Sequence, residues 1–211
     1  MLHCKKLTCV REGRILFKDL SFTVNSGEIV HFEGANGVGK TSLLRLLTGL
    51  STAYAGNVFW QGKDISIDRE SFYQQLLYLG HKTGIKAELT ALENLQFFQA
   101  MQSSRLDLNL WDILAKVGLA GYEDILTSQL SAGQQRRVAL ARLWLNDSSL
   151  WVLDEPFAAL DKLGITVLEA LFIEHVKNGG IVLLTTHQDL SIDASLLSKI
   201  RLIAAVDDLY V

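Results

Sequence analysis

The sequence predicts an α/β protein with a core of parallel strands and helices and a helical lobe inserted in its middle. Short apolar segments rich in β-branched residues alternate with segments whose leucines recur at helical spacing. Between about residues 89 and 145 the pattern is mostly helical, and strand-like segments return only after it. A length of 211 residues suits one domain, or one domain with an inserted lobe.

The individual elements follow from local patterns taken in chain order. Strands are expected where apolar residues alternate or form short runs that end in turn residues. These segments cover residues 16–24, 29–32, 58–60, 76–79, 150–153 and 181–186. Helices are expected where apolar residues recur every three or four positions. They cover residues 41–50, 110–117 and 164–176, and a further helix begins at Thr90 and Glu93, which are spaced as a capping box.

Composition restricts the function classes. The net charge of −3 shows no basic excess, so nucleic acid is not expected as the main partner. Apolar segments such as 150–153 and 181–184 are far too short to cross a bilayer, and the first residues lack the apolar stretch of a signal peptide. A cytosolic protein is therefore expected. Cys4 and Cys9 have neither redox nor zinc spacing, so we expect them to be buried or half-buried thiols in a first strand.

A glycine-rich segment between an expected strand and an expected helix carries a specific motif. Residues 34–41 read Gly-Ala-Asn-Gly-Val-Gly-Lys-Thr, which fits the phosphate-loop pattern G-x-x-x-x-G-K-[ST]. Glycines let backbone N–H groups approach a triphosphate, and the helix start adds free donors and a positive dipole end. Lys40 supplies a cation for the β- and γ-phosphates, and the Thr41 hydroxyl is placed to ligate Mg²⁺. The expected phosphate-binding residues are Gly34, Ala35, Asn36, Gly37, Val38, Gly39, Lys40, Thr41 and Ser42.

Two carboxylates end the apolar strand at residues 150–153. We expect Asp154 to hold Mg²⁺, usually through water, and Glu155 to polarise an attacking water. Pro156, the only proline in the chain, stops the strand directly after them. Taken alone, such a pair also fits solvated acids at a strand end. The complete phosphate loop upstream favours the functional interpretation.

Residues 130–137, Leu-Ser-Ala-Gly-Gln-Gln-Arg-Arg, resemble the ABC signature, usually Leu-Ser-Gly-Gly-Gln, with Ala132 in place of one glycine. Ser131 and Gln134 also form an ordinary capping box, and the two interpretations are compatible. The chain thus resembles the ATP-binding subunits of ABC transporters over essentially its whole length. This resemblance implies one nucleotide-binding domain, residues 1–211, with a P-loop NTPase core, an N-terminal antiparallel β subdomain and a helical lobe at about 84–146. It also implies a homodimer in which ATP lies between the phosphate loop of one copy and Ser131, Gly133 and Gln134 of the other.

Other positions match the family or depart from it. Asp161 resembles the D-loop aspartate near the nucleotide, and His187 resembles the switch histidine at the γ-phosphate, which makes Lys40, Glu155 and His187 the expected catalytic residues. His81 stands where most ABC ATPases have a glutamine, and an imidazole can ligate the metal or accept a proton. Arg11 lies near the place of an aromatic residue that stacks on adenine in many relatives, and its guanidinium can also stack.

The segment 79–95, which contains His81, resembles the ATPase subunits of cytochrome c maturation haem exporters. That resemblance implies ATP and Mg²⁺ as ligands and integral membrane subunits of the maturation complex as partners. It also implies a peripheral position on the cytoplasmic side of the inner membrane, where hydrolysis energises haem export or release of a haem chaperone. The alternatives are an ATPase subunit of another small-solute transporter and a soluble ABC ATPase. A P-loop kinase would not need residues 130–137.

Overall fold

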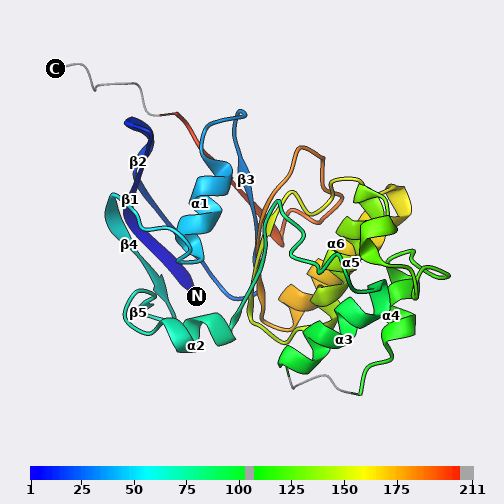
Figure 1. Cartoon of the computed structure of the whole chain (residues 1–211). Helices are drawn as coiled ribbons and strands as arrows, with labels where there is room; N and C mark the ends of the chain where they lie inside the picture. The colour runs from blue at the N-terminus through cyan, green and yellow to red at the C-terminus, as the bar shows by residue number, and fades with distance from the viewer. Residues whose placement is uncertain (103–106, 205–211) are drawn as a thin grey trace.

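Two β-sheets face each other across one helix in the computed structural model, which describes residues 1–102 and 107–204 (Figure 1). The first sheet is antiparallel, with strand order β2-β1-β4-β5. Its strands are β1 (Leu2–Arg11), β2 (Arg14–Val24), β4 (Ala55–Trp60) and β5 (Lys63–Asp64). The second sheet is parallel, with strand order β6-β7-β8-β3-β9. Its strands are β3 (Ile29–Glu33), β6 (Leu76–Leu79), β7 (Leu150–Asp154), β8 (Ile181–Thr185) and β9 (Leu197–Arg201).

Helices occupy the space between the sheets and the opposite face of the parallel sheet. They are α1 (Lys40–Leu47), α2 (Arg69–Gln74), α3 (Ala91–Gln102), α4 (Leu110–Lys116), α5 (Ala132–Ala141) and α6 (Lys162–Lys177), with short 3₁₀ turns at Thr127–Gln129 and Arg142–Leu145. The chain leaves the parallel sheet after β6, forms α3 to α5, and returns as β7, the neighbour of β6. No helix within the described ranges is both long and apolar enough to span a membrane.

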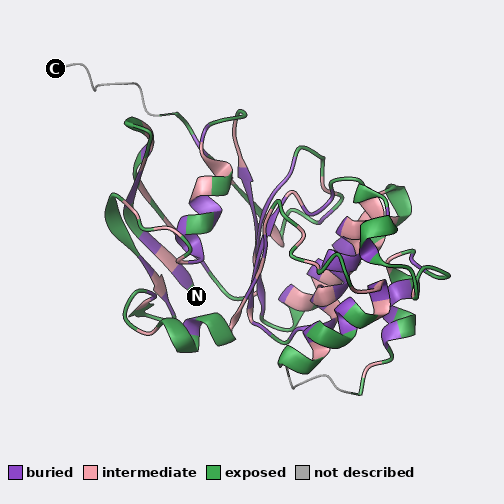
Figure 2. Cartoon of the chain, viewed as in Figure 1, coloured by how far each residue is buried: buried purple, intermediate pink, exposed green. Residues whose placement is uncertain are grey.

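The first core lies between the two sheets and is filled by α1. Leu43, Leu44, Leu46 and Leu47 of this helix are buried, and they join apolar side chains from both sheets in one cluster (Figure 2). Burial of the leucine face therefore explains why this segment forms a helix here, because each buried leucine contributes roughly 2 kcal/mol. Cys4 and Cys9 belong to the same cluster as buried free thiols, as predicted.

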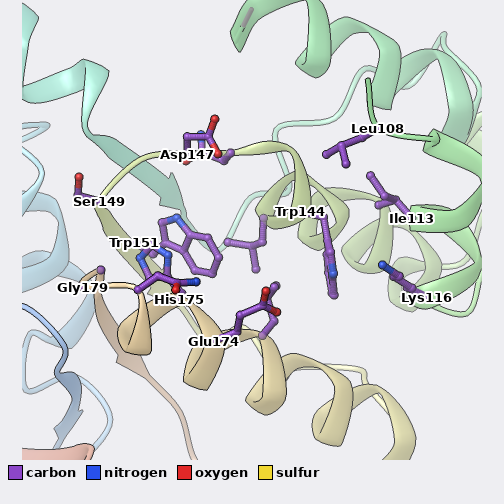
Figure 3. Close-up of a pocket in the computed structure, with 15 residues that line it drawn as sticks. Leu108, Ile113, Lys116, Trp144, Asp147, Ser149, Trp151, Glu174, His175 and Gly179 are labelled. Carbon is purple, nitrogen blue, oxygen red and sulfur yellow. The ribbon is translucent and has the colours of Figure 1, made fainter. Parts of the chain in front are cut away.

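The second core lies on the other face of the parallel sheet, under α6. Leu168, Phe172 and Val176 of this helix are buried against β7 and β8. Near the end of α6 the His175 ring stacks on the indole of Trp151, with 3.8 Å between ring centroids and 11° between planes (Figure 3). Trp151 is 2% exposed, so this stack fixes the end of α6 to the first half of β7.

A third core belongs to the inserted helices. Apolar side chains of α3, α4 and α5 form a separate buried cluster that includes Leu95, Leu114 and Val138. Asn94 is buried beside it, and its side-chain amide donates to the carbonyls of Lys86, Leu89 and Thr90 and accepts from the Lys86 N–H. This residue therefore ties the loop that follows β6 to the first helix of the lobe.

The predicted fold class is confirmed, and the differences are local. Helix α1 ends at Leu47 rather than at residue 50, because Gly49 takes a left-handed φ of 69° and Leu50 is half exposed. The last buried strand ends at Thr185 rather than at residue 186. The sequence analysis did not anticipate α2, β5 and β9.

Candidate active site

The glycine-rich loop connects β3 to α1 and needs glycine for steric reasons. A Cβ on Gly34, which has φ 155°, would lie 2.8 Å from Val38 Cγ1 and 3.0 Å from the Leu202 carbonyl oxygen. Gly39 is the N-cap of α1 with φ 107°, a conformation that other residues rarely adopt. The Lys40 Nζ donates to the Gly34 carbonyl at 2.7 Å. The loop thus presents the first N–H groups of α1 and a lysine at one place, which suits an anion.

The loop forms one wall of a cavity of about 410 Å³ at the carboxyl ends of the parallel strands. The residues that line it come from five segments far apart in the sequence: Leu16, Ala35, Asn36, Gly37, Gly39, Lys40, Thr41, Ser42, His81, Asp154, Glu155 and His187. Ligands of α/β proteins bind at this edge of the sheet, because the loops that follow the strands converge there. The structure therefore brings together the phosphate loop, the acid pair and both histidines.

Asp154 is held by two hydroxyl groups, one from the first turn of α1 and one from the end of the neighbouring strand β8. Its Oδ2 accepts from Thr41 Oγ1 at 2.8 Å, and its Oδ1 accepts from Thr185 Oγ1 at 2.7 Å. The carboxylate is 3% exposed. No three His, Cys, Asp or Glu side chains gather as a metal site in residues 1–102 and 107–204. The hydroxyl and carboxylate oxygens of Thr41 and Asp154 nevertheless fit Mg²⁺, which prefers few protein ligands together with water and phosphate oxygens.

Glu155 occupies a constrained backbone position beside that carboxylate. Its φ is 51°, in the left-handed region, and its N–H donates to the carbonyl and hydroxyl oxygens of Thr185 at 3.2 and 3.1 Å. The Glu155 Oε1 lies 3.5 Å from His187 Nε2. A carboxylate next to a phosphate loop, with an imidazole beside it, can orient and deprotonate a water.

The signature segment lies at the start of α5 and does not line the cavity of its own chain. The capping box is present: Gln134 N–H donates to Ser131 Oγ at 3.3 Å, and Ser131 N–H donates to Gln134 Oε1 at 2.9 Å. A Cβ on Gly133 would lie 3.3 Å from the Ala159 carbonyl oxygen, so α5 packs closely on the loop before α6. The helix start lies at the surface, where Ser131 and Ala132 are exposed, and the cap satisfies only part of its N–H donors.

Asp161 has a structural task in the same chain. Its Oδ1 accepts from the Gly164 N–H at 2.9 Å and caps α6, while its Oδ2 lies 3.2 Å from Arg137 Nη2. The hydrogen bond from the Gly164 N–H lowers the pKa of this exposed aspartate most, and the Arg137 guanidinium lowers it further. The side chain thus connects the signature helix to the loop that follows Glu155.

One expected site residue does not line this cavity, and one residue that contacts the acid pair was missed by the sequence analysis. Arg11 is exposed at the end of β1 and is not among the residues that line the cavity, whereas Leu16 of β2 is. Arg136 was not singled out, yet it is buried and donates to the carbonyls of Gly80, Asp154 and Glu155. No sequence signal marks these contacts, because the acceptors are main-chain oxygens.

The parallel sheet, the phosphate loop and the acid pair together define a P-loop ATPase with an inserted helical lobe. A family model described as ABC transporter matches residues 17–158. The chain is 57% identical over 202 residues to the cytochrome c biogenesis ATP-binding export protein CcmA of Aliivibrio fischeri, covering 96% of this chain and 99% of that one. It is 58% identical over 203 residues to the protein of the same name from Vibrio cholerae, covering 96% and 98%.

Solved structures agree with this result. An ATP-binding subunit of an ABC transporter superposes with a TM-score of 0.79 at 27% identity, covering 89% of this chain and 79% of that one. A putative ABC transporter ATP-binding protein from Pyrococcus furiosus also gives 0.79 and covers 95% and 96%, and at 23% identity it shows the fold alone. The chain belongs to the ABC transporter family, in the group of ATP-binding export proteins named CcmA, and it is a nucleotide-binding ATPase subunit.

Proposed function

We propose that this chain energises the transporter of cytochrome c biogenesis, and that its ATP hydrolysis drives haem export or the release of a haem chaperone. Full-length relatives that carry the name cytochrome c biogenesis ATP-binding export protein support this, at 54–58% identity. The single structural observation that carries the ATPase part is the cavity where the phosphate loop meets Asp154, Glu155 and His187.

In this proposal the phosphate loop binds the triphosphate through its N–H groups, and Lys40 neutralises charge on the β- and γ-phosphates. Thr41 and Asp154 would hold Mg²⁺, which supplies positive charge to the phosphate oxygens when bound. Glu155 polarises the attacking water, and His187, 3.5 Å from its carboxylate, contacts the γ-phosphate. The geometry supports these roles because the side chains meet in one cavity. His81 lines the same cavity, where it would be an additional metal ligand. Arg11 would contact the adenine.

We infer that two copies complete the site. Within one chain the cavity lacks any side chain from the signature segment, whereas Ser131 places a capped helix start at the surface. In the dimer, Ser131, Gly133 and Gln134 of one copy, together with Asp161, approach the nucleotide held by the other. Closing the pair excludes bulk water and positions the single water next to Glu155.

The proposal also covers the partners and the location. Residues 84–146 form the lobe that passes dimer closure to integral membrane subunits of the maturation complex, on the cytoplasmic side of the inner membrane. Phe97 and Met101 on α3 and Trp111 on α4 are exposed apolar side chains, and Met101 is 69% exposed. In this proposal these side chains contact the membrane subunits.

Purification of the tagged chain from solubilised membranes tests the proposal. We expect membrane subunits of the cytochrome c maturation complex to copurify, together with ATPase activity that is lost in Lys40→Ala. The Lys40→Ala variant is also the control for assembly, because it should copurify with the same subunits. Recovery of a permease for another solute would favour the small-solute transporter, and recovery without membrane subunits would favour a soluble ATPase.

A further inference from the structure

Arg136 lies at the junction of three segments that meet behind the cavity. It comes from the second turn of α5, the helix that begins at Ser131. Its Nη1 donates to the Gly80 carbonyl at 2.8 Å, and its Nη2 donates to the carbonyls of Asp154 at 2.6 Å and Glu155 at 3.0 Å. One guanidinium thus bridges the signature helix, the residue before His81 and both members of the acid pair.

This guanidinium is costly to bury, which makes its placement informative. Arg136 is 6% exposed, and its three hydrogen bonds named above go to main-chain carbonyls. Its Nε has no hydrogen-bond partner among the residues that the structure describes. Burial lowers the pKa of Arg136, while the nearby carboxylates of Asp154 and Glu155 oppose that effect. An arginine fits here because its planar fork donates from two separate nitrogens in fixed directions, whereas a lysine ammonium donates from a single nitrogen.

The bonds from Arg136 act on the backbone of Glu155 from one side, and Thr185 acts from the other. Thr185 accepts from the Glu155 N–H, whereas Arg136 donates to the Glu155 carbonyl. With φ at 51°, Glu155 is in a region that is unfavourable for a residue other than glycine. Bonds on both sides of the residue therefore hold its backbone, and this backbone determines where the carboxylate points.

We propose that Arg136 is the positioning residue for the Glu155 carboxylate and connects it to the signature helix. The proposal rests on the function proposed above, in which Glu155 polarises the attacking water and α5 contacts the nucleotide of the second copy. When the start of α5 engages that nucleotide, the guanidinium transmits the position of the helix to the acid pair of the same chain. The acid pair in the cavity of one chain then responds to nucleotide bound in the cavity of the other chain.

The test compares variants of the full chain purified with its copurifying membrane subunits. Arg136→Met should lower kcat about 10- to 100-fold, because a small displacement of a catalytic group has an effect of this size. The Kd for ATP should stay within about threefold, since the phosphate loop is untouched. Arg136→Lys should fall between wild type and Arg136→Met. Methylguanidine added at millimolar concentration should raise kcat of Arg136→Ala and leave kcat of wild type unchanged.

Arg142→Met is the matched control. Arg142 is a half-buried arginine that follows α5, but its guanidinium lies over the Phe98 ring, 4.1 Å from the centroid. Its loss should lower stability without a selective loss of kcat. The proposal is overturned if kcat of Arg136→Met stays within about threefold of wild type. It is also overturned if Arg136→Met and Arg142→Met lose kcat equally and methylguanidine does not raise kcat of Arg136→Ala. It also fails if the Kd for ATP of Arg136→Met rises in proportion to the loss of kcat.

Lys40→Ala and Glu155→Gln separate this inference from the proposed function. If both are inactive and Arg136→Met is as active as wild type, the positioning role alone is wrong. If Glu155→Gln keeps wild-type turnover, the proposed role of Glu155 is wrong and the positioning role falls with it.

Discussion

The Thr41 hydroxyl donates to the Asp154 carboxylate, with 2.8 Å between Oγ1 and Oδ2, across 113 positions of sequence. Thr41 lies in the first turn of α1, directly after the loop that follows β3, and Asp154 ends β7. Thr185, at the end of the strand between them, donates to the other carboxylate oxygen. The polar side chains that follow β3 and end β7 and β8 thus meet at one place, which is why a metal–phosphate site can form there.

Removing the Thr41 hydroxyl should lower stability and weaken the response to Mg²⁺. In Thr41→Ala one oxygen of a carboxylate that is 3% exposed loses its donor. We expect the free energy of unfolding to fall by about 1–3 kcal/mol, as for other buried groups left without a partner. Urea denaturation measures this change, and a thermal shift with ATP and Mg²⁺ against ATP and EDTA measures the metal response. Thr41→Ser keeps the hydroxyl and should behave as wild type, so equal behaviour of the two variants would contradict the prediction.

Glu155→Gln should bind ATP and stop turning it over. The amide keeps the shape of the side chain but cannot accept the proton of the attacking water, so we expect kcat to fall at least about 100-fold. The variant should therefore accumulate as a closed ATP-bound dimer, visible by size-exclusion chromatography with ATP and absent with ADP. Glu174→Gln changes an exposed glutamate of α6 and serves as the control. Normal turnover in Glu155→Gln would remove Glu155 from the mechanism.

Much of the fold could be predicted from the sequence, because local chemistry and burial agree there. The capping box at the start of α3 is formed as expected, with Glu93 N–H donating to Thr90 Oγ1 and Thr90 N–H donating to Glu93 Oε2. The apolar runs of β7 and β8 are fully buried, as both faces of the parallel sheet are covered. The phosphate loop and acid pair could be predicted because their chemistry demands specific residues in fixed order.

The rest depends on contacts that leave no local pattern. Strand β9 reads Leu-Ser-Lys-Ile-Arg, is at most half buried, and is recognised as a strand only through its ladder with β3. The contacts of Arg136 are with main-chain oxygens, which every residue has. Family resemblance draws attention to Arg11, but the residue of the first two strands that lines the cavity is Leu16, an ordinary strand residue. Tertiary arrangement decides these cases, and periodicity does not encode it.

Asn94→Leu should loosen the segment between His81 and the helical lobe. Asn94 is 0% exposed, and its side chain makes four hydrogen bonds to the main chain of Lys86, Leu89 and Thr90. Leucine has a similar volume but takes the acceptor from the Lys86 N–H and one donor from each of three carbonyls, which keep other donors. The free energy of unfolding should therefore fall by about 2–4 kcal/mol. Hydrogen exchange should report faster exchange at the Lys86 amide in particular. Asn178→Ala, at an exposed helix end, is the control, and unchanged exchange at Lys86 would show that the amide is not the anchor.

His175 should make stability fall as the solution becomes acidic. Burial lowers the pKa of His175 to about 4, while in the unfolded chain it is about 6.5. The unfolded state therefore takes up a proton below pH 6.5 that the folded state binds only near pH 4. The contribution of His175 to the free energy of unfolding is fully present above pH 6.5. It declines by about 1–3 kcal/mol between pH 6.5 and 4, and it stays constant below about pH 4.

His175→Phe isolates this contribution, since phenylalanine keeps a ring to stack on Trp151 and cannot titrate. Three charged residues, Lys116, Asp147 and Glu174, line the same pocket as His175 and are unchanged in the variant (Figure 3). Their titration should therefore largely cancel in the difference between the two proteins. Urea denaturation at pH 7.5, 6.5, 5.5 and 4.5 measures that difference, from above the unfolded pKa of about 6.5 to just above the folded pKa of about 4. The wild type should lose stability relative to His175→Phe only below about pH 6.5, because above it both proteins are uncharged at this position. A difference that is the same at all four pH values would mean that the folded protein protonates His175 as readily as the unfolded chain does.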